Sequence, residues 1–192
     1  FLIIKSILDA ADGELARVKN RPSYTGRYLD SVSDIILNFI LILLIGFTNN
    51  DSGILIILAF IGLQLQGTLY NYYYVILRNV HEGDTTSRIT ENKTPVAFPY
   101  EKQSHVNILF GIYKFCYGIF DFIIYKLDPT AKNSTIFPKW FMTLLSVYGL
   151  GFQLFMIGML MVFGLKSILL SLIIGFTLGI PILIAIRKWI LN

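Results

Sequence analysis

Four long segments with almost no charged residue constrain this chain more than any other feature. They lie at residues 35–47, 54–63, 140–165 and 167–186. A soluble bundle needs a charged outer face on each helix, whereas a membrane helix needs about 20 apolar residues to cross the hydrocarbon core. The composition agrees, because 55% of the residues are hydrophobic and only 15% are charged. We therefore expect an all-α, polytopic integral membrane protein.

The basic net charge fits the same interpretation. The chain has 16 Lys and Arg against 12 Asp and Glu, which gives a net charge of +4. Basic loops of membrane proteins stay on the cytoplasmic side and contact anionic lipid head groups, so we expect no nucleic acid partner. The single cysteine, Cys116, excludes an internal disulfide, and the sequence has no Cys/His spacing typical of a zinc site.

The alternation of apolar and polar stretches predicts the order of the helices. We expect the end of a helix at 1–17 and further membrane helices over 24–47, 54–78, 140–163 and 167–186. We expect short turns at 48–53 and at 164–166.

We expect the whole chain, 1–192, to form one transmembrane domain. Within it, residues 79–139 form a cytoplasmic or interfacial excursion. Their apolar segment 106–127 either spans the membrane or lies along the interface, and we favour the interface because Lys114 and Asp121 share one helical face. The chain begins inside an apolar run at Phe1, so we expect the first helix of the bundle to be missing.

Four aspartates at the predicted cytoplasmic ends of the first two helices carry the strongest chemical signal. Asp9 and Asp12 are three residues apart and Asp30 and Asp34 four apart, so each pair shares one helical face. The short loop between the helices makes them neighbours, and both pairs can converge on one pocket. A carboxylate in a membrane helix costs about 2.5–3.5 kcal/mol, and two divalent cations would balance four of them. Oxygen ligands favour magnesium, manganese or calcium over zinc or copper.

Small and basic residues accompany these carboxylates. Gly13 and Ala16 leave a bare stripe where a ligand can approach closely, and Arg17 is a cation suited to a phosphate group. The alternative is ordinary solvation with local ion pairs, such as Arg27 with Asp30 and Asp34.

The spacing Asp9-x2-Asp12-Gly13-x2-Ala16-Arg17-x8-Gly26-x3-Asp30-x3-Asp34 resembles the signature of the CDP-alcohol phosphotransferase family at all nine fixed positions. The resemblance implies a six-helix membrane enzyme that displaces CMP from a CDP-linked lipid or alcohol. It implies that Asp9, Asp12 and Asp30, with help from Asp34, bind two Mg²⁺ or Mn²⁺ ions. It makes Asp34 the general base. The implied CDP-binding face comprises Asp9, Asp12, Gly13, Ala16, Arg17 and Gly26.

From this resemblance we expect an enzyme of phospholipid biosynthesis that transfers a phosphatidyl group from CDP-diacylglycerol to a polar alcohol. Its partners are then the CDP-linked lipid, the alcohol and membrane lipids, and its active site faces the cytoplasm. A homodimer is compatible with this interpretation. The alternatives are a CDP-choline or CDP-ethanolamine phosphotransferase acting on diacylglycerol, or a non-enzymatic protein for ion transport or assembly.

Polar residues inside the predicted spans are the remaining candidates. Gln64, Gln66 and Asn71 are expected to hydrogen-bond between helices, with a place in the substrate cavity as the alternative. Several basic residues set the topology or bind an acceptor phosphate: Arg21, Arg27, Arg78, Arg88 and Lys93.

Overall fold

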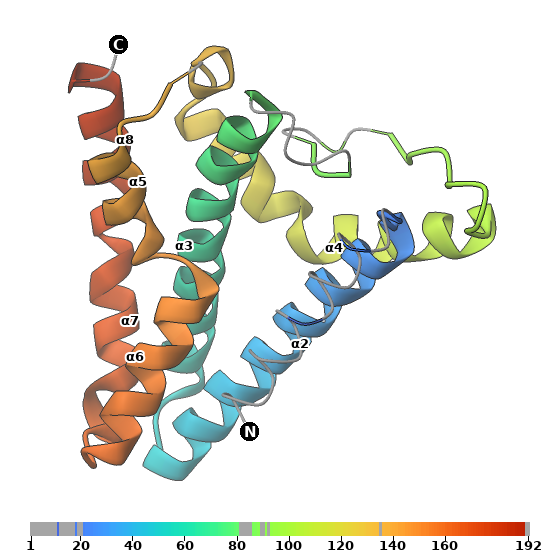
Figure 1. Ribbon diagram of the computed structural model, residues 1–192. Helices are drawn as coiled ribbons and strands as arrows, with labels where there is room; N and C mark the ends of the chain where they lie inside the picture. Colours follow the sequence, from blue (N-terminus) through green and yellow to red (C-terminus); the bar gives the residue numbers. More distant parts are fainter. Residues whose placement is uncertain are drawn as a thin grey trace.

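The computed structural model describes residues 11, 18, 21–80, 86–88, 91, 93–134 and 136–190. In this part of the chain all regular structure is helical (Figure 1). The elements are α2 (Tyr24–Asn49), α3 (Gly53–Val80), α4 (Gln103–Leu127), η1 (Ala131–Asn133), α5 (Lys139–Ser146), α6 (Leu150–Val162), η2 (Lys166–Ile168), α7 (Leu169–Thr177) and α8 (Gly179–Ile190). The predicted all-α class is confirmed.

Several of these helices are long and apolar enough to cross a membrane. Among the described residues they are Tyr24–Asn49, Gly53–Val80, Gln103–Leu127 and Lys166–Trp189, and the bent pair α5 and α6 satisfies the same criteria together. Large apolar side chains cover their outer faces, including Phe47, Ile54 and Phe155, which are 66%, 72% and 62% exposed. Such exposure suits contact with lipid tails. The chain is a polytopic helical membrane bundle, as predicted.

The α2–α3 hairpin is closed by a tight turn at one end of the bundle. Asn50 adopts a left-handed conformation with φ of 57°, and its backbone N–H donates to the carbonyl oxygens of Gly46 and Phe47. Gly46 allows close packing there, because a Cβ atom would lie 2.3 Å from the Ile56 side chain. The turn predicted at 48–53 is confirmed. It leaves the start of α2 and the end of α3 at the opposite end of the bundle.

The predicted helix 140–163 is broken, which corrects the expectation of a continuous helix, whereas the predicted helix 167–186 lies within one span, Lys166–Trp189, that has an irregular turn at Leu178. α5 and α6 meet at 45°. α7 ends at Thr177, and the following helix contains Pro181, which has no N–H to donate to the Thr177 carbonyl. The α5–α6 break packs against the irregular turn at Leu178: the Tyr148 hydroxyl donates to the Phe176 carbonyl oxygen at 2.9 Å. A Cβ on Gly179 would lie 2.0 Å from that hydroxyl, so a larger residue there would displace the Tyr148 side chain.

α4 lies across one end of the bundle. Its first half packs through Val106 and Phe110 against Tyr28 near the start of α2. Its second half packs through Ile124 against Tyr72, near the end of α3. Because both contacts are at the end remote from the α2–α3 turn, α4 runs from α2 to α3 instead of along the bundle (Figure 1). This arrangement agrees with the favoured interfacial position of segment 106–127.

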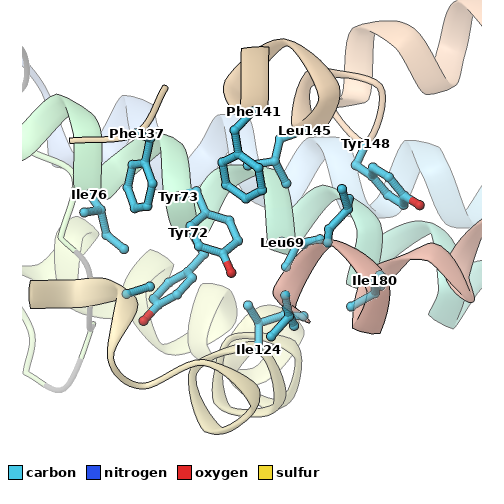
Figure 2. Packing of buried hydrophobic residues seen from close by; sticks show 13 residues of the cluster. Leu69, Tyr72, Tyr73, Ile76, Ile124, Phe137, Phe141, Leu145, Tyr148 and Ile180 are labelled. Carbon is cyan, nitrogen blue, oxygen red and sulfur yellow. The ribbon is translucent and has the colours of Figure 1, made fainter. Parts of the chain in front are cut away.

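A dense aromatic core surrounds a buried ion pair at this same end. Figure 2 shows Tyr73 stacked edge-on with Phe137 and Phe141, with ring centroids 5.4 and 5.6 Å apart. Beside them the Arg187 Nε donates to a carboxylate oxygen of Asp128 at 2.7 Å, and the Tyr73 hydroxyl donates to the same oxygen at 2.6 Å. Since Asp128 follows α4 and Arg187 belongs to α8, the pair joins the end of α4 to α8.

A polar network ties α3 to α6 and α7 in the middle of the bundle. The Gln66 Nε2 donates to the Ile173 carbonyl oxygen and the Thr177 hydroxyl, both at 2.9 Å. The Gln153 Nε2 donates to the Leu63 carbonyl oxygen at 3.1 Å and to the Gln66 Oε1 at 3.2 Å. The expected interhelical role of Gln66 is therefore confirmed.

Candidate active site

The first half of α2 carries the part of the predicted site that the structure describes. Asp30 and Asp34 stand one helical turn apart and line a cavity of about 370 Å³ between α2, α3 and α4. Gly26 lies in the first turn of α2, where its N–H donates to the Ser23 Oγ at 2.9 Å. A Cβ on Gly26 would lie 3.3 Å from that oxygen, so glycine leaves room for the cap.

The other half of the predicted site lies outside the described residues: Asp9, Asp12, Gly13, Ala16 and Arg17. Within the described ranges there is no group of three or more His, Cys, Asp or Glu side chains placed to bind a metal ion. The structure therefore places two of the four predicted carboxylate ligands, Asp30 and Asp34, in one cavity.

A carboxylate outside the motif fixes the start of α2. Glu101 accepts hydrogen bonds from the Ser23 hydroxyl at 2.8 Å and from the backbone N–H groups of Thr25 and Tyr24 at 2.7 and 3.2 Å. Partial burial alone would raise the pKa of Glu101, but these donors outweigh it and hold the pKa below its ordinary value. Glu101 thus serves as an N-terminal cap supplied from another part of the chain.

Arg27 pairs with Glu91, which differs from the local pairing considered from sequence. Its guanidinium bonds the Glu91 carboxylate and the Thr86 carbonyl oxygen. The Tyr28 hydroxyl donates to the other Glu91 oxygen at 3.0 Å, and the Arg27 guanidinium lies 4.8 Å from the Tyr28 ring centroid. These contacts hold the segment after α3 against α2, beside the cavity that contains Asp30.

α3 forms the wall that faces these aspartates. Gln64, Thr68 and Asn71 follow one face of the helix and line the smaller cavity, and Thr68 and Asn71 also line the larger one. For Gln64 and Asn71 the alternative of a place in the cavity is thus the one observed. Thr68 was not singled out by the sequence, although its spacing of four from Gln64 and three from Asn71 is a signal of a polar face.

α4 supplies the third wall and separates two adjoining cavities. The Tyr117 hydroxyl donates to the Ser31 carbonyl oxygen at 3.0 Å, and the Tyr113 hydroxyl to Asp121 at 3.3 Å. Tyr113 and Asp121 line both cavities. Asp121 therefore adds a carboxylate near Asp30 and Asp34 that the nine-position motif could not indicate. The shared helical face of Lys114 and Asp121 is confirmed, because both line the larger cavity.

The larger cavity, of about 660 Å³, is predominantly basic. Arg88, Lys114 and Lys132 line it, and within the described part of the chain none of them forms an ion pair with a carboxylate. Two acidic residues also line the cavity: Glu91 forms an ion pair with Arg27, and Asp121 accepts a hydrogen bond from the Tyr113 hydroxyl. Three cations around one cavity favour an anionic or strongly polar ligand.

A family model described as CDP-alcohol phosphatidyltransferase matches residues 1–99 of the chain. The match contains the nine-position motif and both α2 and α3, and it ends before α4. Comparison with curated proteins and with solved structures finds no match.

Proposed function

Because this chain belongs to the CDP-alcohol phosphatidyltransferase family, we propose that it transfers a phosphatidyl group from CDP-diacylglycerol to a polar alcohol and releases CMP. Family membership implies transfer of a phosphatidyl group from a CDP-alcohol, and the donor lipid and the acceptor class are our proposal. The observation that carries it is the placement of Asp30 and Asp34, one turn apart, in a cavity enclosed by α2, α3 and α4. The reaction is a step of phospholipid biosynthesis.

Asp34 is the proposed general base. Its carboxylate accepts the proton of the acceptor hydroxyl, whose oxygen forms a bond to the phosphorus that bears the diacylglycerol group. The bond from that phosphorus to the CMP oxygen breaks, and CMP leaves with the electron pair. An aspartate of ordinary pKa is a weak base, so the contribution of Asp34 depends on its position beside the hydroxyl. Asp30, on the same face of α2, lines the same cavity one helical turn away.

The carboxylates fit a pair of divalent ions. Asp30 and Asp34 offer only oxygen ligands, which suit Mg²⁺ or Mn²⁺, and the motif adds Asp9 and Asp12. We propose that Asp9, Asp12 and Asp30, assisted by Asp34, hold two such ions. When bound, the ions would neutralise charge on the phosphate oxygens of the donor. We also propose that Gly13, Ala16, Arg17 and Gly26 contribute to CDP binding.

We propose that the polar acceptor enters through the larger cavity and that this end of the bundle faces the cytoplasm. Arg21, Arg78, Arg88 and Lys93 all belong to segments at the start of α2 or the end of α3. Such an accumulation is typical of cytoplasmic segments. The three cations of the larger cavity make phosphorylated alcohols the first acceptors to test.

The test is CMP release from CDP-diacylglycerol by the full-length protein in detergent with Mg²⁺ or Mn²⁺. The acceptors are glycerol 3-phosphate, inositol phosphate, inositol and serine. We expect release with one acceptor, its loss on chelation, and a reduction of about 10²- to 10⁴-fold in the Asp34→Asn variant.

The matched control is Asp51→Asn, the same substitution in the turn at the opposite end of the bundle. It should retain the wild-type rate. Equal rates for Asp34→Asn and Asp51→Asn would contradict the assignment of Asp34. If the wild type released no CMP with any of these acceptors, this would contradict the proposed donor and favour a CDP-choline type donor or a non-enzymatic role.

A further inference from the structure

Two buried polar side chains on α3 line the candidate active site, and each has an atom without a hydrogen-bond partner among the described residues. Gln64 and Thr68 are only 4% and 6% exposed. Within the described part of the chain, neither the Gln64 Nε2 nor the Thr68 Oγ1 has a hydrogen-bond partner. Buried polar groups in proteins are nearly always paired, and within a membrane there is no surrounding water to replace a missing partner. Both atoms therefore indicate a bound group.

The neighbouring glutamine on the same helix shows what a purely structural residue does. Gln66, two residues from Gln64, donates to the Ile173 carbonyl oxygen and the Thr177 hydroxyl of α7. Gln64 points instead to the other side of α3, where it lines the smaller cavity with Asp30 and Asp34. The Gln66 amide thus joins α3 to α7, whereas the Gln64 amide lines the cavity.

The depth of Gln64 in the bundle identifies the part of a lipid that can reach it. The antiparallel pairing of α2 and α3 brings the Phe39 and Phe60 rings within 5.1 Å. Counting from that contact, Gln64 lies near the level of Asp34, and Thr68 lies one turn closer to the polar end. Leu63 and Leu150 line the same cavity as Gln64. Asn38 and Gln153 line it as well, so its wall combines apolar and neutral polar side chains and suits a largely apolar group that carries oxygen acceptors.

We propose that Gln64 and Thr68 bind the glycerol ester groups of the lipid substrate. The Gln64 Nε2 can only donate, so it needs an acceptor such as an ester carbonyl oxygen, and Thr68 Oγ1 can donate to the second ester. A neutral amide beside leucines suits an ester better than a phosphate, which favours cationic partners. This inference rests on the proposed function, because it places the glycerol backbone beside Asp34.

The test measures lipid binding without turnover. The thermal shift of the full-length protein is titrated with CDP-diacylglycerol and with its dialkyl ether analogue, which lacks both carbonyl oxygens, in the absence of acceptor. The variants are Gln64→Leu and Thr68→Val, which remove the donors and keep the approximate side-chain volume. The control Thr143→Val alters an exposed threonine whose hydroxyl donates only to its own helix, at the Lys139 carbonyl oxygen.

We expect the wild type to bind the ester lipid about 3- to 10-fold more tightly than the ether, as for one or two neutral hydrogen bonds. Gln64→Leu should lose this preference and bind both lipids like the ether, and Thr68→Val should lose part of it. Without lipid, Gln64→Leu should keep the wild-type Tm, whereas Gln66→Leu should lower it.

Equal binding of the two lipids by the wild type, or equal weakening of both by Gln64→Leu, would overturn the proposal. Failure of both lipids to bind the wild type would overturn it as well. The proposed function is judged separately, because CMP release with no difference between ester and ether lipids would leave the transferase activity standing and remove only the ester subsite.

Discussion

Glu101 shows how one side chain, distant in sequence from the motif, can determine where the motif helix begins. Its carboxylate accepts hydrogen bonds from the backbone N–H groups of Thr25 and Tyr24, which have no acceptor within α2. The negative charge of Glu101 also lies near the positive end of the helix dipole. Asp30 and Asp34 lie within three turns of the start of α2. The contacts of Glu101 therefore help to fix the direction in which these two aspartates face.

The lowered pKa of Glu101 predicts a pH dependence of stability. A carboxyl whose pKa is lower in the folded state stabilises the fold fully at pH values above its pKa in the unfolded chain, which is ordinarily 4.5. This contribution to stability is lost as the pH falls through the pKa of the folded state. We expect Glu101→Gln to lower the Tm at pH 7 and to match the wild type near pH 3. Thermal unfolding between pH 3 and 7 checks this. A Tm difference that persists unchanged at pH 3 would contradict it.

At the scale of elements, α4 is the least conventional part of the fold. It has 25 residues, so it is about 37 Å long and could cross a bilayer. We expect it to lie along the interface instead, because its contacts bring its first half to Tyr28 of α2 and its second half to Tyr72 of α3. One face of the helix remains apolar and exposed at Ile108, Phe115 and Ile119, as suits a helix lying at a membrane interface.

Cysteine labelling tests the course of α4. In a Cys116→Ser background, single cysteines at Lys102 and Lys126 mark its two ends, and one at Ser52 marks the α2–α3 turn. We expect a membrane-impermeant maleimide to label positions 102 and 126 from the same side of sealed vesicles, and position 52 from the other. Labelling of 102 and 126 from opposite sides would mean that α4 crosses the bilayer.

At the scale of the whole molecule, two cavities meet between α2, α3 and α4. The smaller one holds Asp30 and Asp34 of the motif and the wall formed by Gln64 and Thr68, and the larger one is basic. The Asp128–Arg187 pair and the Gln66 network hold the other helices of the bundle together. Under the proposed function, a lipid and a polar alcohol would approach the same aspartates from two sides.

Gly118 offers a way to close the larger cavity without altering its charges. It lines that cavity, and a Cβ there would meet only the Lys114 side chain, at 3.5 Å. We expect Gly118→Leu to reduce CMP release at least tenfold and to preserve the Tm, because the added side chain enters the cavity and not the core. Gly111→Leu is the matched control, because Gly111 lies two turns earlier on the same face of α4, is exposed and does not line the cavity. Equal activity of the two variants would contradict the role of the larger cavity.

The sequence by itself determined the class of this protein and the family to which it belongs. Uncharged runs of membrane length favour a helical bundle, and a nine-position motif of carboxylates, small residues and an arginine at fixed spacing can be recognised from the local sequence alone. The helices at 24–47 and 54–78 were predicted within two residues of their observed ends for the same reason. Local periodicity and turn residues suffice for such elements.

Only the tertiary structure decided what surrounds the motif. The cap from Glu101, the pairing of Arg27 with Glu91, and the cavity wall of Gln64 and Thr68 join residues 30 to 80 positions apart, and no local pattern encodes such contacts. The break near Gly149 was missed because an apolar run looks the same whether its helix is straight or broken. Burial decides which polar side chains must find hydrogen-bond partners inside the protein, and burial is a property of the assembled helices.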